Sequence, residues 1–403
     1  MSLRSDSENA HNFDYQLVVA VTALLIIGLM MIYSATFALG YELEGQPGYF
    51  FMRQVMWTVL GGLGLVLLAR IEYHTWRRYS IIGLAITLLL LGLVLFIGNE
   101  RFGGRRWLFN GSIQPSELTK LVVILYIADW LSAKGERIRK VTYGLIPFAI
   151  LLGLVAGLIM LQRDLSTSAL IILTTVAMFF IAGGNLWQIL ASSLLGGATF
   201  GFLISQSEYR LARITAFLDP LSDPLGSNYQ VRQILIALGS GGVTGVGLGV
   251  SRQKFGYIPA SHTDGIFAIL GEELGLIGGL VVIALFAFLA YRGFRIALAA
   301  PDTFGAILAS GLTCSLIFQT LLNIGVITAT LPFTGIPLPF ISFGGSSLVV
   351  SLAHVGLLLA VSRRTMPETE VGPGGEQRDY APDDFRRRNR RARVPRAGRR
   401  ARA

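Results

Sequence analysis

The sequence predicts an all-α polytopic membrane protein with about ten transmembrane helices and one large extracytoplasmic loop between the seventh and the eighth helix. Two observations support this fold class. Of the 403 residues, 53% are hydrophobic and only 14% are charged, whereas a soluble protein usually carries about 25% charged residues. Apolar runs long enough to cross a hydrocarbon core of about 30 Å recur along the chain. Because lipid offers the backbone no hydrogen-bond partners, these runs are expected to be helices.

Ten apolar runs are the expected spans. They cover roughly 14–36, 53–70, 79–98, 116–132, 145–162, 165–183, 186–205, 265–291, 303–327 and 343–362. The longest gap between them, residues 206–264, is the predicted extracytoplasmic loop. Apolar residues at helical spacing predict two amphipathic surface helices in it, one with Leu211 and Ile214 and one with Ile234 and Leu238. The following "GSGGVTGVGLGVS" lacks the ending of a phosphate-binding loop and is expected to form a tight, mobile turn.

Positive charges predict the orientation. The gaps 69–80, 132–143 and 291–295 are basic and fall on one side of a ten-span protein, together with the Arg-rich end of the chain. That side is the expected cytoplasm. The chain is therefore divided into a cytoplasmic N-terminus (1–13), a ten-helix membrane domain (14–364) and a disordered, Arg-rich cytoplasmic tail (365–403). The tail is expected to bind anionic lipids rather than nucleic acid.

Three acids lie near the outer end of the eighth span. Asp264 begins this span, where it is either a functional acid or a helix cap. On a continuous helix Glu272 would lie about 12 Å deeper, and it could line the same cavity wall as Asp264. Glu273 would face away from Asp264. At this depth both glutamates need protein, water or a cation beside them, so a buried structural ion pair explains them as well as catalysis does.

A second group of polar residues lies in "GGRRWLFNGSIQPSELTK", before and within the fourth span. Gln-Pro-Ser-Glu is typical of a helix start. Glu117 and Lys120 are three residues apart and share a helix face, either as an acid and a base at a site or as a stabilising pair. Trp107 is expected to be an interfacial anchor. Basic residues on the predicted outer side, such as Arg106, indicate an anionic ligand there, unless they reach to lipid phosphates.

Four segments resemble the SEDS family of FtsW, RodA and SpoVE. They are "SHTDGIFAILGEELGLIGG", "RITAFLDPLSDPLGSNYQ", "GGRRWLFNGSIQPSELTK" and "LPFISFGGSS". The resemblance covers about Asp14 to Arg364 and is closer to FtsW and SpoVE. It implies a peptidoglycan glycosyltransferase of the bacterial cytoplasmic membrane that polymerises lipid II, an undecaprenyl-diphosphate-linked disaccharide pentapeptide, on the outer face. It also implies a class B penicillin-binding protein transpeptidase and other divisome or elongasome membrane proteins as partners.

The resemblance also implies functional residues. Asp264 is the essential acid of the family's His-Thr-Asp motif, here with His262 and Thr263, and we expect it to be a general base or a ligand of a divalent cation (Mg²⁺ or Mn²⁺). One departure is Gly265, where the family commonly has Phe. A second is "RDLSTS" in place of Pro-Asp-Leu-Gly-Thr, which weakens the transfer of a role to Asp164.

Cations for a lipid diphosphate are expected on other segments. The resemblance implies functional positions at Arg106, Glu117 and Lys120. We expect Arg106, Lys120 and Arg213 to hold the diphosphate, because the leaving group gains negative charge. Glu117 is expected to orient Lys120.

Two other functions remain open from the residues alone. Ten spans with intramembrane acids also suit a flippase of the lipid-linked precursor, and a non-catalytic scaffold of the division complex is the third interpretation. A transporter is expected to place its essential charges near the bilayer midplane. The charged motifs here cluster on the predicted outer side, which favours an enzyme.

Overall fold

The computed structural model describes residues 13–101, 104–108, 114–205, 217, 228–332 and 335–364. Most of them are helical, which confirms the predicted fold class. The long helices are α1 (Tyr15–Glu44), α2 (Tyr49–Arg70), α3 (Tyr73–Ile97), α4 (Pro115–Lys134), α5 (Ile146–Leu161), α6 (Leu165–Ile181), α7 (Leu186–Ser205), α9 (Tyr229–Gly241), α10 (Ile266–Leu298), α11 (Thr303–Ile327) and α12 (Gly345–Ser362). Short helical turns, Gly135–Arg139 and Val141–Leu145, precede α5. Strands β1 (Asn99–Arg101) and β2 (Gly104–Trp107) form a small antiparallel hairpin that the sequence did not predict.

The chain is a multi-pass membrane protein. Within the described residues, seven helices are long and apolar enough to cross a membrane: α1, α2, α3, α5 with the turn before it, α10, α11 and α12. The other three predicted spans coincide with α4, α6 and α7. Ten crossings therefore remain a prediction, although each predicted span corresponds to a helix.

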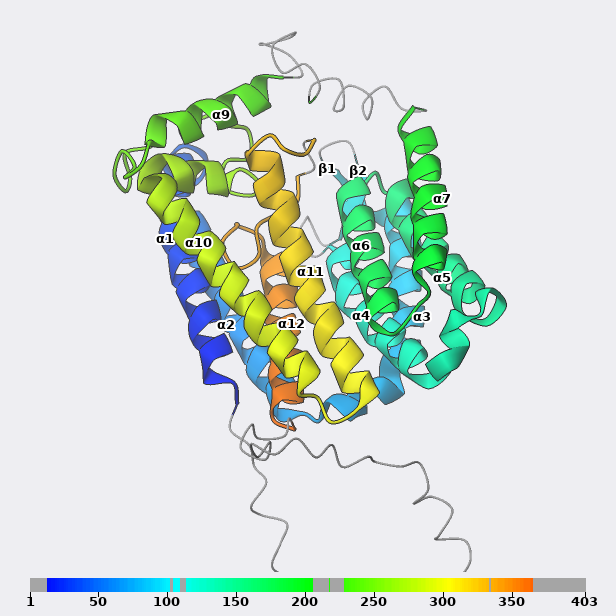
Figure 1. Cartoon of the computed structure of the whole chain (residues 1–403). Coiled ribbons are helices and arrows are strands. Elements are labelled where there is room, and N and C mark those ends of the chain that lie inside the picture. The colour runs from blue at the N-terminus through cyan, green and yellow to red at the C-terminus, as the bar shows by residue number, and fades with distance from the viewer. Residues whose placement is uncertain are drawn as a thin grey trace, which may run out of the picture. The chain divides into compact units, whose positions relative to one another are not determined.

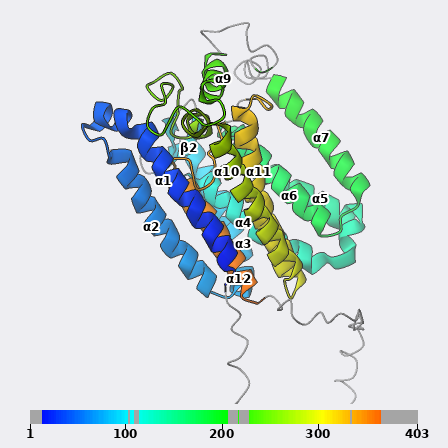
Figure 2. The ribbon, with the colours of Figure 1, turned by 60° about the vertical axis from the view of Figure 1, so that its left-hand side comes forward.

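Helices α11 and α12 form the centre of the bundle (Figures 1 and 2). The most apolar window of α12 is 83% buried and that of α11 is 72% buried, whereas that of α2 is only 11% buried. Around this centre, α2 packs on α12, α10 packs on α11, and α3 packs on α4. The outer helices expose many apolar side chains on the side that faces away from the centre. Lipid can cover these side chains, because in a membrane an apolar side chain gains little by moving from hydrocarbon into the protein.

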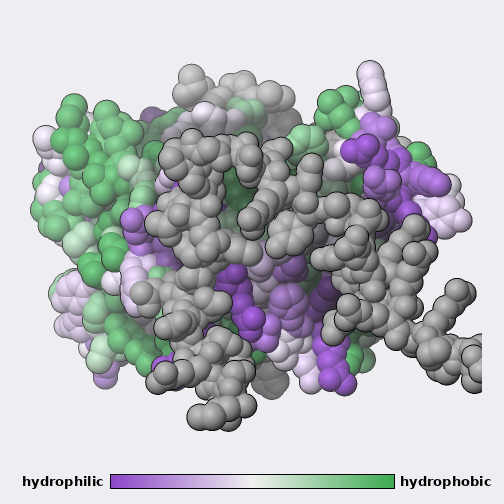
Figure 3. Space-filling model, turned by 60° about the horizontal axis from the view of Figure 1, so that its bottom comes forward, coloured by the Kyte–Doolittle hydropathy of each residue, from purple (hydrophilic) through white to green (hydrophobic). Residues whose placement is uncertain are grey.

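Both ends of the described bundle lie at its lower end in Figure 1. The Arg363 guanidinium stands 5.2 Å from the Phe13 ring, and Arg292 of α10 forms an ion pair with Asp14 at 2.7 Å. Figure 3 looks at this lower end and shows hydrophilic residues gathered between the grey atoms. The basic gaps 69–80 and 291–295 both lie at this end, since Arg363 donates to the carbonyl of Ala69 and Arg292 pairs with Asp14, so they share one side, as the charge pattern predicted.

The predicted loop 206–264 contains one of the two expected amphipathic helices. In α9, Ile234 and Ala237 are buried, and Leu235 is exposed. The other expected helix, with Leu211 and Ile214, lies outside the described residues. So does the predicted tail, 365–403.

Helix α10 is broken at Gly275, where φ is 67° and ψ is −165°. Residues 266–274 therefore form a separate short helix, and the direction of α10 changes near its upper end (Figure 1). The glycine-rich residues 242–250, which we call the corner loop, pack into this break. The N–H groups of Leu276 and Ile277 donate to the carbonyls of Gly242 and Val243, at 3.0 and 3.1 Å.

Two further hydrogen bonds hold the other side of the break. The N–H groups of Val246 and Gly247 donate to the carbonyls of Glu272 and Glu273, at 3.0 and 3.1 Å. The corner loop thus replaces the helix hydrogen bonds that are lost at Gly275. It is tight, as predicted, and these bonds fasten it to α10. Its expected mobility stays a prediction. The break lies beyond Glu272, so the helix from Ile266 to Glu272, which the placing of Glu272 relative to Asp264 relies on, is unbroken.

We predict that Gly245→Ala destabilises the protein much more than Gly249→Ala. Both glycines have positive φ, 82° and 80°, but a Cβ at Gly245 would lie 2.1 Å from the Glu273 carbonyl oxygen, whereas none at Gly249 would meet an atom within 4 Å. Gly249→Ala is expected to cost only the about 1 kcal/mol of a left-handed alanine. Thermal unfolding of both variants in detergent measures the difference, and equal losses would contradict the docking of the loop.

Candidate active site

Asp264 lies just before α10, at the upper end of the bundle, with a half-exposed side chain. The Thr263 hydroxyl donates to its Oδ1 at 2.8 Å. The side-chain amide of Asn323 in α11 donates to its backbone carbonyl at 3.0 Å. A Cβ on Gly335 would stand 3.3 Å from its other oxygen, Oδ2. The carboxylate is therefore oriented by Thr263 and bordered by backbone that lacks a side chain.

Lys120 is connected to the same face of α11. Its amine forms a buried ion pair with Glu117 at 2.7 Å and donates to the Gln319 side chain at 2.9 Å. Gln319 and Asn323 are one helical turn apart, so their side chains are neighbours at about 6 Å. Lys120 of α4 therefore contacts one turn of α11, through Gln319, and Asp264 contacts the next turn, through Asn323.

An irregular segment, residues 335–344, runs between these side chains and the start of α12. Gln319 donates to the carbonyl of Pro337 at 2.9 Å, and Asn323 donates to that of Ile336 at 2.7 Å. On the other side, the buried Gln54 of α2 donates to the Ser342 carbonyl at 3.1 Å. Non-helical backbone is tolerated at membrane depth where protein side chains satisfy it, and three buried amides do so here. Sequence reasoning missed them, although Gln319 and Asn323 stand out as polar residues four apart in an apolar run.

His262 contributes packing rather than charge. Its ring lies 5.6 Å from the rings of both Phe50 and Phe343, and its carbonyl accepts a hydrogen bond from the Phe343 N–H at 2.9 Å. Burial lowers the pKa of His262 to about 4, because desolvation disfavours the charged imidazolium. His262 is therefore neutral at pH 7 and supplies no cation for a phosphate.

Arg106 and Asp164 form the second half of the site. The Arg106 guanidinium, 24% exposed, lies 3.9 Å from the Asp164 carboxylate. That carboxylate also accepts hydrogen bonds from the Gln114 side chain at 3.0 Å and from the Thr167 backbone and hydroxyl at 3.1 and 3.0 Å. Asp164 thus caps α6 and ties it to the β2 hairpin and to the start of α4. Its role was underestimated from the sequence, where "RDLSTS" departs from the family pattern.

The two halves form one row along the start of α4. Arg106 contacts Asp164, which binds Gln114, and one turn further on Glu117 and Lys120 lead to α11 and Asp264. Trp107, next to Arg106, is half-buried, and its indole N–H has no partner among the described residues. Arg213, the third predicted cation, lies outside the described residues.

Glu272 and Glu273 do not belong to this row. Glu273 forms an ion pair with Lys254 at 3.0 Å and accepts the Ser34 hydroxyl of α1 at 2.7 Å. Glu272 accepts the Ser251 hydroxyl and the backbone N–H groups of residues 252 and 253, at 3.1 and 3.3 Å. Both are almost fully buried. They anchor the segment after the corner loop, so the structural interpretation describes them better than the catalytic one.

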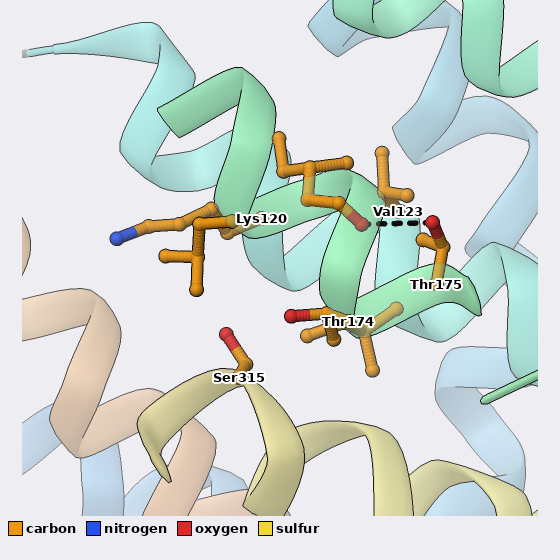
Figure 4. Close-up of a pocket in the computed structure, with 8 residues that line it drawn as sticks. Lys120, Val123, Thr174, Thr175 and Ser315 are labelled. Atoms are coloured by element: carbon orange, nitrogen blue, oxygen red, sulfur yellow. Dashed lines mark hydrogen bonds between the residues drawn. The ribbon is translucent and has the colours of Figure 1, made fainter. Parts of the chain in front are cut away.

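A narrow pocket lies below Lys120, between α4, α6 and α11 (Figure 4). Val123, Thr174, Thr175 and Ser315 line it, and the Lys120 amine points away from them. The Thr175 hydroxyl donates to the Ile171 carbonyl at 2.8 Å. The pocket has no room for a water molecule. The pocket is therefore too small for a substrate, whereas Arg106 and Asp264, at the ends of the row, are partly exposed.

Known proteins are similar to this chain over most of its length. The family model of FtsW, RodA and SpoVE, described as cell cycle protein, matches residues 15–366. Stage V sporulation protein E of Bacillus subtilis is 43% identical over 87% of this chain and 97% of its own. Probable peptidoglycan glycosyltransferase FtsW of Trichlorobacter lovleyi is 40% identical over 87% and 93%.

Solved structures are similar as well. One, from work on the structural coordination of polymerization and crosslinking by a peptidoglycan synthase complex, has a TM-score of 0.70 at 30% identity and covers 87% of this chain and 98% of that one. The rod shape determining protein RodA of Thermus thermophilus has a TM-score of 0.66 at 28% identity over 88% and 98%. With a family match over most of its length and relatives at this identity, the chain belongs to the FtsW, RodA and SpoVE family.

Proposed function

We propose that this protein is a peptidoglycan glycosyltransferase that polymerises lipid II into glycan strands on the outer face of the bacterial cytoplasmic membrane, during cell division or cell-shape growth. The row from Arg106 to Asp264 carries the proposal, since it offers cations and a partly exposed carboxylate at one end of the bundle. Relatives named peptidoglycan glycosyltransferase support it.

Asp264 acts as the general base. The acceptor hydroxyl attacks the anomeric carbon of the donor sugar, its proton passes to the Asp264 carboxylate, and the bond to the lipid diphosphate breaks. Thr263 and Asn323 hold Asp264 in place through its side chain and its backbone. The fixed position matters because a misplaced base loses most of its effect.

Arg106 and Lys120 stabilise the departing diphosphate. Arg106 stands at a partly exposed end of the row, and its buried Nε has no partner among the described residues, which leaves this donor available for a phosphate if the side chain moves. The Lys120 amine is already paired with Glu117, which holds it in place. Arg213 is proposed as a third cation from the family resemblance.

A divalent cation fits this site only together with the substrate. Among the described residues, no three His, Cys, Asp or Glu side chains are close enough to hold a metal ion. Mg²⁺, however, is commonly bound by one carboxylate together with substrate phosphates and water. Asp264 would hold the ion, which would neutralise charge on the diphosphate.

The membrane setting and the partners follow from the same placement. The basic lower end faces the cytoplasm, with both termini, and the site opens on the outer side. A class B penicillin-binding protein transpeptidase is the proposed partner, because a structurally similar chain comes from a peptidoglycan synthase complex. Other divisome or elongasome proteins join it, and anionic lipids bind the Arg-rich tail.

We predict that Asp264→Asn abolishes lipid II polymerisation, with a loss of about 10²–10⁴-fold, the usual contribution of a general base. Glu44→Gln, which removes an exposed acid at the same end of the bundle, is the matched control and should keep full activity. The assay uses purified protein in detergent with a co-expressed transpeptidase. Activity of Asp264→Asn equal to that of Glu44→Gln would falsify the assignment of Asp264 as the base. The same assay distinguishes an enzyme from a flippase, because a flippase would make no glycan in detergent.

Arg106→Gln is expected to lower kcat by about a hundredfold, because one donor to the developing charge is lost. Arg105→Gln is the control, since Arg105 is the exposed neighbour on the same strand and its side chain leaves the strand on the opposite face. Steady-state kinetics on lipid II compare the two. A similar loss in both variants would point to general charge rather than to Arg106.

The metal proposal predicts that chelation by EDTA stops polymerisation and that Mg²⁺ or Mn²⁺ restores it. The protein should remain folded without the ion, because the described carboxylates form no cage for it. Activity and thermal unfolding are measured in parallel. Activity that persists in EDTA would leave Asp264 with the role of base alone.

A further inference from the structure

The corner loop, residues 242–250, has an unusual combination of properties for a segment on the outside of a bundle. Its four large side chains, Val243, Val246, Leu248 and Val250, are all apolar and are between 42% and 62% exposed. No charged residue occurs from 233 to 251, so the loop is framed by Arg232 and Arg252. A patch of this kind is unfavourable in water and indicates an apolar partner.

The loop lies at the depth of the lipid interface. It is hydrogen-bonded to Leu276 and Ile277, the first residues of α10 after the break. From Leu276 to Arg295, at the basic end of α10, the helix rises about 29 Å. That distance matches a hydrocarbon core of about 30 Å, so the loop sits where the hydrocarbon meets the head groups.

The apolar surface of the loop continues into that of α10. Val243 is bonded to Ile277, whose side chain is 54% exposed, and Leu280 follows one turn below at 53%. These α10 side chains face lipid in a protein that spans the membrane. Beyond the loop, Phe255 and Tyr257 are exposed beside Arg252, as expected of residues at the head groups.

The backbone of the loop also suits lipid. The N–H groups of Gly245, Val246, Gly247 and Val250 all donate within the protein, and the Lys254 amine donates to the Gly249 carbonyl at 2.7 Å. An apolar medium penalises unpaired backbone groups, and these bonds reduce that penalty.

We propose that the corner loop inserts into the lipid interface of the leaflet on the side of the candidate site, with phospholipid as its partner. Since the loop is bonded to Glu272 and Glu273, this contact sets the depth of residues 266–274, and hence of Asp264, relative to the head groups. The membrane contact itself does not depend on the proposed glycosyltransferase activity.

Depth-dependent fluorescence quenching tests the proposal. A fluorophore is attached to Leu248→Cys in the full chain, which is placed in nanodiscs of phosphatidylethanolamine and phosphatidylglycerol with doxyl-labelled phospholipids. The single native Cys314 is buried, so wild-type protein is the labelling blank. Leu280→Cys on α10 is the lipid-facing control. Glu44→Cys is the water-facing control, because α1 has 30 residues and at about 45 Å extends beyond the hydrocarbon.

The expected result is severalfold stronger quenching of the Leu248→Cys label by a shallow doxyl group than of the Glu44→Cys label, with little quenching by aqueous iodide. Leu280→Cys should respond more to a deep doxyl group. Iodide quenching of Leu248→Cys equal to that of Glu44→Cys would overturn the proposal. So would iodide quenching that disappears only when a second protein is added, since the surface would then dock protein.

A second measurement needs no substitution. A phospholipid with a photoactivatable group near its head group should label residues 243–250 of the unmodified chain in nanodiscs, as detected by mass spectrometry of its peptides. Labelling confined to α10, with none in the loop, would contradict insertion. Glycan synthesis is unaffected by the outcome of this experiment, so the two proposals fail separately.

Discussion

The break in α10 at Gly275 is the constraint on which the upper end of the molecule depends. A helix that ends inside a membrane protein leaves backbone groups without partners, and lipid cannot satisfy them. The corner loop does so from both sides of the break, and Glu272 and Glu273 hold the chain that follows it. The short helix 266–274 is therefore fixed at one end, with Asp264 just ahead of its other end.

The same rule organises the candidate site. Each buried polar side chain in the row is paired: Lys120 with Glu117 and Gln319, Asp164 with Gln114 and Thr167. An unpaired charge at this depth would be costly, so the polar groups are connected from one helix to the next. Arg106 and Asp264, at the two ends of the row, are partly exposed. These two residues are the ones that the proposed function assigns to the diphosphate and to the acceptor hydroxyl.

The residues that position the site differ from the residues that are proposed to contact the substrate. Asp164, Gln319 and Asn323 position their neighbours and lie within the protein, whereas Arg106 and Asp264 are exposed enough to touch a ligand. The proposed insertion of the corner loop would also fix the depth of Asp264 relative to the membrane surface. In the proposed reaction the diphosphate of lipid II lies at the head groups, so a base held at a fixed distance from the membrane surface could meet the sugar attached to that diphosphate.

The sequence by itself determined the helical membrane fold, a helix at each of the ten predicted spans, and the candidates Asp264, Arg106 and Lys120. Apolar run length and charge are local properties, so they can be read along the chain. Only the tertiary structure decided that α10 breaks at Gly275 and that Glu273 pairs with Lys254. It also showed the links from Arg106 to Asp164, from Lys120 to Gln319 and from Asn323 to Asp264. Those contacts join residues far apart in the chain, where no spacing pattern records them.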